Sequence, residues 1–261
     1  MPNKLAVLVG INEYPGCPLE NCVNDIRDVR DYLHNDHGWP YVGMRLLVDG
    51  RATTYAIKEH LHWLVDTAKA GDTALFYYSG HGAQYAGRGH DQEVDKLNEC
   101  ICPVDFDWSP GRMILDKDFV DLFSGFKPGV KFYWCADSCH SGDLDRSINP
   151  YRIRAYPVPL DMEHRIRVAR EKGLTPPVRP GAGILNYAFM AGCLSNQTSA
   201  DGGNGIKNGA FTYCTLRALR REVGGNLNRV CDDAAHELRV LGYAQQPTVD
   251  GPLANAPRVE L

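Results

Sequence analysis

The sequence lacks any apolar run long enough to cross a membrane, which takes about 18 consecutive residues. It also lacks an excess of positive charge, since 28 Lys and Arg stand against 32 Asp and Glu, and a nucleic-acid partner would require a basic face. Its nine cysteines are scattered instead of forming a dense framework, which is typical of a reducing compartment. The start, Met1–Lys4, leads directly into an apolar run and leaves no room for a signal peptide. We therefore expect a cytoplasmic protein that binds neither membranes nor nucleic acid.

The chain of 261 residues has a hydrophobic content of 44%, enough for one large domain with a sizeable core. Short apolar runs alternate with segments whose apolar residues recur at helical spacing. Predicted strands cover residues 5–11, 44–48, 73–78, 130–134 and 183–191, with an edge strand at 246–249, and predicted helices cover 24–37, 54–65, 116–123, 160–172, 210–223 and 227–241. This alternation predicts an α/β fold with a mostly parallel sheet covered by helices on both faces.

Two short blocks follow predicted strands and carry reactive side chains. One is Tyr77–Gly82, which contains His81, and the other is Cys135–Gly142, which contains Cys139. Active sites of open α/β sheets form just past the carboxyl ends of the strands, so the two side chains can meet in space. A thiol beside an imidazole is the basic arrangement of a cysteine hydrolase. We predict that Cys139 is the nucleophile and that His81 activates the thiol or protonates the leaving amine.

The neighbours of these two residues suit a site that a substrate approaches closely. Glycines flank His81 on both sides, and the backbone N–H groups of Gly82 and Cys139 are the expected donors to a tetrahedral oxyanion. We expect Cys139 in an exposed turn, where amide groups would favour the thiolate. His140 is the alternative base, which we disfavour because adjacent side chains in an extended turn point apart.

Two carboxylates are candidates for substrate recognition. Asp137 stands two residues before Cys139 and would point the same way at a strand end. Asp25 opens the first helix, beside the end of the first strand. The alternative interpretation is that it only interacts with the helix dipole, since carboxylates are common in the first turn of a helix. If both face one pocket, they form an anionic slot for a guanidinium or an ammonium group, and a bidentate carboxylate clamp suits Arg best.

The chain resembles the metacaspases and bacterial orthocaspases, which are caspase-like cysteine peptidases. The matching segments are 21–25, 78–82, 102–105, 137–142, 196–201 and 209–212. The resemblance implies a caspase-hemoglobinase fold, a three-layer sandwich around a mostly parallel six-stranded sheet. It also implies a dyad of His81 and Cys139, cleavage of proteins or peptides after Arg or Lys, and a monomer. The side chains that it places in the pocket for the residue before the cut bond, the S1 pocket, are Cys22, Asp25, Ser79 and Asp137.

The same resemblance implies a single catalytic domain over 1–261, with a large-subunit-like part at 1–142 and a small-subunit-like part at 183–261. The connecting segment 143–182 holds six of the sixteen prolines and eight Lys or Arg against five acids. Exposed, Pro-rich loops are preferred sites of proteolytic nicking. If the enzyme cuts after basic residues, this linker supplies candidate self-cleavage sites at Arg146, Arg152, Arg154, Arg165, Arg167, Arg170, Lys172 and Arg179. An ordinary surface loop is the alternative interpretation.

The chemistry requires no cofactor, but metacaspases are often activated by Ca²⁺ that loop carboxylates hold. Hard oxygen ligands suit calcium, and this chain has several acids in the corresponding places. They are Asp91, Glu93, Asp95 and Glu99 after the His81 strand, Asp116 and Asp118 before a helix, and Asp143 and Asp145 after Cys139. A Lys separates Asp116 from Asp118, and a solvated acidic loop is the alternative, so no metal ligand is assigned.

Other readings of the cysteines are weaker. A phosphatase loop requires a Cys and an Arg separated by five residues around the phosphate. It is excluded here because Arg146 is one place too far from Cys139, and because Asp143 and Asp145 would repel a phosphate. A metal site on Cys100 and Cys102 lacks a second pair of ligands. Two alternatives stay open: a catalytically silent or zymogen caspase-like domain that regulates or binds, and a related peptidase with another preference, if Asp25 and Asp137 do not face the substrate.

Overall fold

The computed structural model describes residues 2–87, 97–139, 151–174, 186–194, 197–203, 205–221 and 225–257. Six strands form the main sheet, in the order β2-β1-β3-β7-β8-β9, and three short strands form a second sheet, β4-β5-β6. The strands are β1 (Lys4–Gly10), β2 (Met44–Val48), β3 (Thr73–Ser79), β4 (Gly82–Tyr85), β5 (Asn98–Ile101), β6 (Ile114–Leu115), β7 (Lys131–Asp137), β8 (Tyr187–Ala191) and β9 (Thr248–Asp250). The helices are α1 (Cys22–Asn35), α2 (Thr54–Thr67), α3 (Asp116–Phe123), α4 (Leu160–Glu171), α5 (Ala210–Arg221) and α6 (Leu227–Val240).

The main sheet has the predicted mostly parallel arrangement. All of its pairings are parallel except that of β8 with β9, the edge strand. The central strands β1, β3 and β7 are buried almost throughout, as expected for continuous apolar runs covered on both faces. The prediction of an α/β fold with helices on both faces is therefore confirmed.

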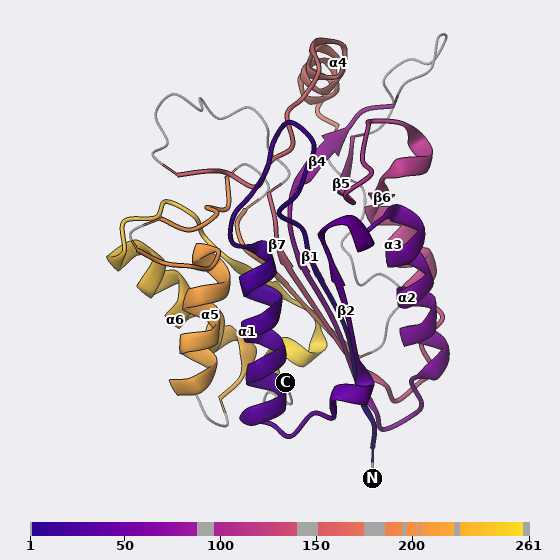
Figure 1. Ribbon diagram of the computed structural model, residues 1–261, viewed down its shortest axis with the longest axis vertical. Helices are drawn as coiled ribbons and strands as arrows, with labels where there is room; N and C mark the ends of the chain where they lie inside the picture. The colour runs from indigo at the N-terminus through magenta and orange to yellow at the C-terminus, as the bar shows by residue number, and fades with distance from the viewer. Residues whose placement is uncertain are drawn as a thin grey trace.

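Helices cover the sheet on two sides (Figure 1), with α1, α5 and α6 on one face and α2 and α3 on the other. Alternate residues of β3 serve the two cores, because successive side chains of a strand point to opposite faces. Phe76 packs in the core with α2 and α3, whereas Leu75 packs in the core with α1, α5 and α6. The sheet is therefore packed against helices on both faces.

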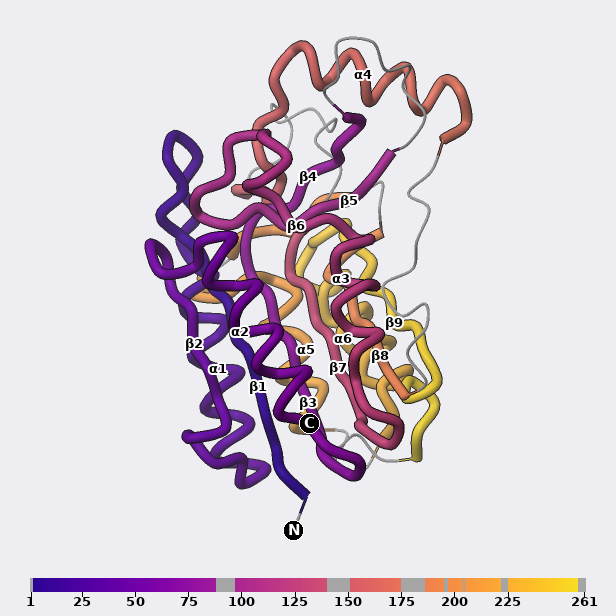
Figure 2. The backbone as a smooth tube through the Cα atoms, turned by 90° about the vertical axis from the view of Figure 1, so that its right-hand side faces the viewer, coloured from indigo at the N-terminus to yellow at the C-terminus, as the bar shows by residue number. Residues whose placement is uncertain are grey.

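Three residues stand at the same level where the central strands end. Gly10 pairs with Ser79, and Ser79 pairs with Asp137, so the ends of β1, β3 and β7 are in register. The chain then passes from β3 into β4 of the small sheet, and α4 lies at this same end of the molecule in both views (Figures 1 and 2). The register places two of the predicted pocket residues, Ser79 and Asp137, side by side.

Some boundaries differ from those predicted. The predicted strand 183–191 is observed only as β8, because residues 183–185 lie outside the described residues. The helix predicted at 160–172 is present as α4. The division into subunit-like parts stays a prediction. Within the described residues, no helix is long and apolar enough to span a membrane.

Candidate active site

Arg154 lies in a buried, acidic pocket at the carboxyl edge of the sheet. Its side chain and those of three surrounding aspartates are inaccessible to solvent. Its Nη2 is 2.7 Å from Asp25 Oδ2 and 2.9 Å from Asp201 Oδ1. Its Nη1 is 2.8 Å from Asp137 Oδ2 and 2.8 Å from Ser79 Oγ. The pocket therefore binds a guanidinium group through both terminal nitrogens, which is the geometry that carboxylates offer to arginine.

The burial of Arg154 contradicts one expectation from the sequence, which placed it in an exposed linker. A cation can be buried only with anionic partners, and here three distant parts of the chain supply them. Arg152 does lie at the surface, where Nη2 is 2.9 Å from Glu20 Oε1. Arg165, Arg167 and Arg170 lie in helix α4, and Lys172 directly follows its last residue. Arg146 and Arg179 lie outside the described residues.

The predicted pocket residues come together, with the aspartates held by further hydrogen bonds. Asp25 is in the first turn of α1, where Oδ2 also accepts from Ser79 Oγ at 2.7 Å and Oδ1 accepts from the Gly209 amide at 2.8 Å. A Cβ at residue 209 would overlap the Arg154 guanidinium and the Asp137 carboxylate. Glycine is therefore required where this loop approaches the pocket.

Asp137 is fixed from the other side by two residues that sequence reasoning did not single out. Ser199 Oγ donates to Asp137 Oδ1 at 2.7 Å, and Thr212 Oγ1 donates to Oδ2 at 2.6 Å. Cys22 is also buried, and its thiol lies 4.0 Å from Asp201 Oδ1. Asp201 occurs in a matching segment of the sequence, but nothing in its local pattern indicated that its carboxylate enters the pocket.

Burial has a large effect on the protonation of Asp25. Loss of solvent raises its pKa to about 7, which Arg154 opposes and the nearby charge of Asp137 reinforces. Three carboxylates around one guanidinium leave an excess of negative charge, so retention of a proton by one of them relieves the repulsion. The charge of this pocket thus depends on pH near neutrality.

The backbone around Arg154 is bound as an added strand. Its amide donates to the Ser199 carbonyl at 3.1 Å, and the Asp201 amide donates to the Arg152 carbonyl at 2.8 Å. These bonds form an antiparallel bridge between Ile153 and Ala200. Strand addition of this kind is a common way for a protein to bind an extended peptide.

The carbonyl oxygen of Arg154 meets the two amides predicted to form the oxyanion hole. The Gly82 amide donates to it at 2.9 Å and the Cys139 amide at 3.4 Å. Ala155 continues beside Gly82 in a parallel bridge, and the Tyr156 amide donates to the Gly82 carbonyl at 3.0 Å. The peptide bond between Arg154 and Ala155 therefore lies beside the predicted nucleophile.

His81 is held in one orientation by surrounding groups. Its Nε2 lies 2.8 Å from the Cys17 carbonyl oxygen, and because a carbonyl only accepts, Nε2 carries the proton and Nδ1 is the basic nitrogen. Its amide donates to Tyr14 Oη at 3.0 Å, and the two rings are 4.5 Å apart. Burial lowers the pKa of His81 to about 4, although the carbonyls of Cys17 and Arg154 oppose this shift. The imidazole is therefore neutral at neutral pH.

Cys139 differs from its predicted setting in an exposed turn. It is inaccessible to solvent and packs with Ala155, Cys193 and Ile153. Burial raises the pKa of its thiol to about 12, against a lowering by backbone groups of Ser199 and Arg154. The expectation of exposure is wrong because the segment 153–155 covers the cysteine. His140, the alternative base, lies outside the described residues.

A cavity of about 240 Å³ opens beside His81, between the loop after β1 and the segment that follows Tyr151. Its lining residues are Cys17, Pro18, Leu19, His81, Tyr151, Arg152, Ile153, Ala155 and Pro157. Water can therefore reach the vicinity of the imidazole while the Arg154 side chain stays buried.

The acids considered for calcium are only partly described. Asp91, Glu93, Asp95, Asp143 and Asp145 lie outside the described residues, and among those described no three His, Cys, Asp or Glu side chains form a group suited to a metal. Asp118 contacts Lys58 Nζ at 3.5 Å instead. The described residues thus give no calcium site.

The fold and this edge of the sheet define a three-layer α/β domain in which a histidine and a cysteine lie at the ends of neighbouring strands. Residues 4–145 match the family described as metacaspase, peptidase C14 domain. Metacaspase-1 of Arabidopsis thaliana is 31% identical over 235 residues, which cover 85% of this chain and 60% of that protein. Metacaspase-2 of Trypanosoma brucei brucei is 30% identical over 264 residues, which cover 93% of this chain and 71% of that protein. The chain belongs to the metacaspase family of caspase-like cysteine peptidases.

A solved structure supports the fold. A crystal structure of a Geobacter sulfurreducens protein has a TM-score of 0.71 with 24% identity, and the match covers 95% of this chain and 93% of that one. The chain spans 60% of the Arabidopsis relative and 34% of Metacaspase-1A from Aspergillus oryzae.

Proposed function

We propose that this protein is a cysteine endopeptidase that cleaves after Arg or Lys, and that its first substrate is its own bond between Arg154 and Ala155. The observation that supports this is the way Arg154 is bound. Its guanidinium lies among Asp25, Asp137 and Asp201, while its carbonyl oxygen accepts from two converging amides. A residue held by both its side chain and its reacting carbonyl is held as a substrate is before the cut.

In the proposed reaction, the thiol proton of Cys139 passes to Nδ1 of His81 as the sulfur attacks. The sulfur attacks the carbonyl carbon of Arg154, and the oxyanion is stabilised by the amides of Gly82 and Cys139, already within 2.9 and 3.4 Å of that oxygen. The imidazolium then gives its proton to the nitrogen of Ala155, the C–N bond breaks, and a thioester remains. Water, activated by His81, hydrolyses the thioester, so Arg154 becomes a carboxylate and the thiol is regenerated.

The neutral pair suits this sequence of proton transfers. With pKa values of about 4 for His81 and about 12 for Cys139, thiol and imidazole are both uncharged, and the proton moves as the sulfur attacks. General base catalysis of this kind requires the imidazole to be unprotonated. The uncut chain holds its own segment where other substrates would bind, so the proposed self-cleavage precedes cleavage of other proteins.

The second candidate is a zymogen or silent domain that only binds. The observation that favours it is the burial of the Cys139 thiol under the chain's own segment, which keeps other peptides away. In that case the bond after Arg154 stays intact, and the pocket serves only to anchor the segment.

Fluorogenic peptides that end in Arg, Lys or Asp before the reporter distinguish these functions. The wild type and Cys139→Ala are compared, each with calcium and with a chelator. Hydrolysis after Arg or Lys that is absent in Cys139→Ala supports the proposal, and the chelator reveals any need for calcium. Cleavage after Asp would overturn the assigned pocket, and the absence of all hydrolysis would favour the binding function.

A further inference from the structure

We propose that Asp201 is a specificity-determining residue, which makes the pocket prefer Arg over Lys in the residue before the cut bond. This inference rests on the proposed peptidase function. Asp201 comes from the loop before α5, far in sequence from the two carboxylates predicted to form the pocket. Its side chain is inaccessible to solvent, and its Oδ1 accepts from Arg154 Nη2 at 2.9 Å.

The partners of Arg154 divide between its two terminal nitrogens. Nη2 donates to Asp25 Oδ2 and Asp201 Oδ1, and Nη1 donates to Ser79 Oγ and the Asp137 carbonyl and pairs with the Asp137 carboxylate. Its Nε has no hydrogen-bond partner among the described residues. Recognition therefore depends on the terminal N–H groups, and Asp201 completes the set around Nη2.

A lysine ammonium presents its donors from one nitrogen, whereas a guanidinium presents them from two in a fixed plane. A lysine bound here could satisfy the Asp137 and Ser79 side of the pocket or the Asp25 and Asp201 side, but not both. Carboxylates left without a donor in a buried pocket are costly. Asp201 therefore adds a partner that arginine satisfies and lysine leaves incomplete.

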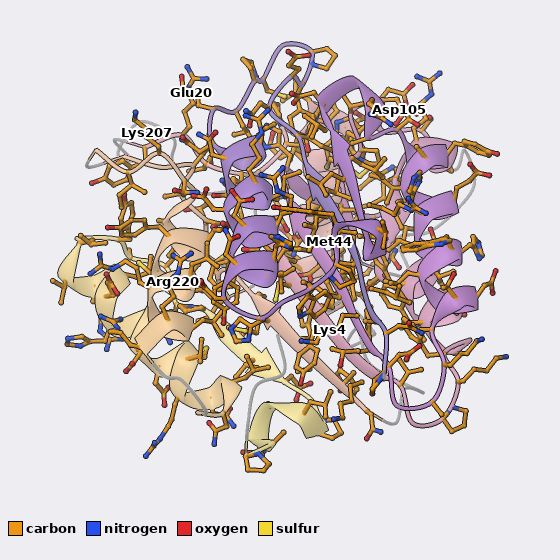
Figure 3. The ribbon with its side chains drawn as sticks, turned by 60° about the horizontal axis from the view of Figure 1, so that its bottom comes forward. Lys4, Glu20, Met44, Asp105, Lys207 and Arg220 are labelled. Atoms are coloured by element: carbon orange, nitrogen blue, oxygen red, sulfur yellow. The ribbon has the colours of Figure 1, made fainter. Side chains whose placement is uncertain are left out.

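Asp201 also contacts the bound segment through its backbone. Its amide donates to the Arg152 carbonyl at 2.8 Å, while its Oδ2 accepts from the Glu20 amide at 2.6 Å and its carbonyl accepts from Asn21 Nδ2 at 3.0 Å. Figure 3 shows Glu20 near the start of α1, on the same side of the molecule as Lys207, whose carbonyl accepts from Asn24 Nδ2 at 2.8 Å. The loop that carries Asp201 is thus fixed to α1, and its carboxylate is positioned before a substrate arrives.

The test compares kcat/KM for matched peptides with Arg or Lys before the reporter, for wild type, Asp201→Asn and Glu20→Gln. For Asp201→Asn we expect a fall of about 10-fold to 100-fold with Arg, because the guanidinium loses a charged acceptor, and a change below about 3-fold with Lys. Glu20→Gln removes a charge from the segment before α1 that binds the Asp201 loop, but its carboxylate meets Arg152, so the Arg to Lys ratio should be kept. If Asp201 had a merely structural role, Asp201→Asn would lower kcat/KM equally for both substrates. The Arg to Lys ratio would then be unchanged, which would overturn the inference.

A substrate variant provides a second test that does not depend on how Asp201→Asn folds. A peptide with ω-methylarginine lacks one terminal N–H, so wild type should cut it about 10-fold or more slowly than the Arg peptide. Equal rates would contradict the claim that the terminal N–H groups are all held. If wild type cuts no peptide at all, the proposed function fails, and that outcome is distinct from an unchanged Arg to Lys ratio.

Discussion

The carbonyl oxygen of Arg154 lies 2.9 Å from the amide nitrogen of Gly82. Gly82 follows the proposed catalytic histidine, so this hydrogen bond joins the reacting carbonyl to the residue expected to stabilise its negative charge. The side chain of the same arginine is buried among three carboxylates. Together these contacts make the uncut chain resemble an enzyme with its substrate in place.

The covered thiol leads to a prediction about reactivity. Because Cys139 is buried and its pKa is raised to about 12, it should react slowly with iodoacetamide at pH 7.5 in the uncut chain. Arg154→Ala removes the side chain that anchors the covering segment and should speed alkylation of Cys139 about 10-fold or more, as for loss of a buried charged contact. Mass spectrometry of the modified peptide measures this rate. Arg152→Ala is the matched control, and equal rates in both variants would contradict the role of Arg154 as the anchor.

Asp25 should make the stability of the fold depend on pH. Its pKa is about 7 in the folded chain and near the ordinary value of 3.8 when unfolded, so folding takes up a proton between these values. The stability that this proton contributes is full below pH 3.8 and is lost as the pH rises through about 7. Relative to Asp25→Asn, the wild-type free energy of unfolding should therefore fall between pH 5 and pH 8.

Urea unfolding at several pH values measures this difference. A wild-type stability that rises with pH relative to Asp25→Asn would show that the folded-state pKa of Asp25 is not raised.

Tyr14 should support catalysis by holding the histidine. Its hydroxyl accepts from the His81 amide at 3.0 Å and donates to the Cys102 carbonyl at 2.8 Å. Tyr14→Phe leaves a buried amide without its partner, which costs about 1–3 kcal/mol, and should lower kcat for an Arg peptide more than it changes KM. Tyr55→Phe removes the hydroxyl of a tyrosine that is 70% exposed and should change neither constant. A change in KM alone for Tyr14→Phe would place its role in binding instead.

Much of this architecture follows from local sequence. Continuous apolar runs predicted the buried strands β1, β3 and β7, and helical spacing of apolar residues predicted α1 and α2. The rule that sites form at the carboxyl ends of parallel strands brought His81 and Cys139 to one edge. These features were predictable because they depend on residues close together in the chain.

The features that were missed depend on distant residues. Arg154 stands in a Pro-rich, basic segment whose composition indicates exposure, yet it is buried because residues 25, 137 and 201 supply carboxylates. Cys139 is covered by Ala155. The sequence pattern between these two residues gave no sign that the chain returns to the cysteine. Strands β4 to β6 were missed because runs of two to four residues are too short to show a period.

The central claim is that the bond after Arg154 is bound for cleavage, and the most direct test is mass spectrometry of the purified chain after incubation with and without calcium. We expect two fragments, one that ends at Arg154 and one that begins at Ala155, and an intact chain for both Cys139→Ala and Arg154→Ala. A wild-type chain that stays whole under both conditions, or that is cut first at another residue, would contradict it.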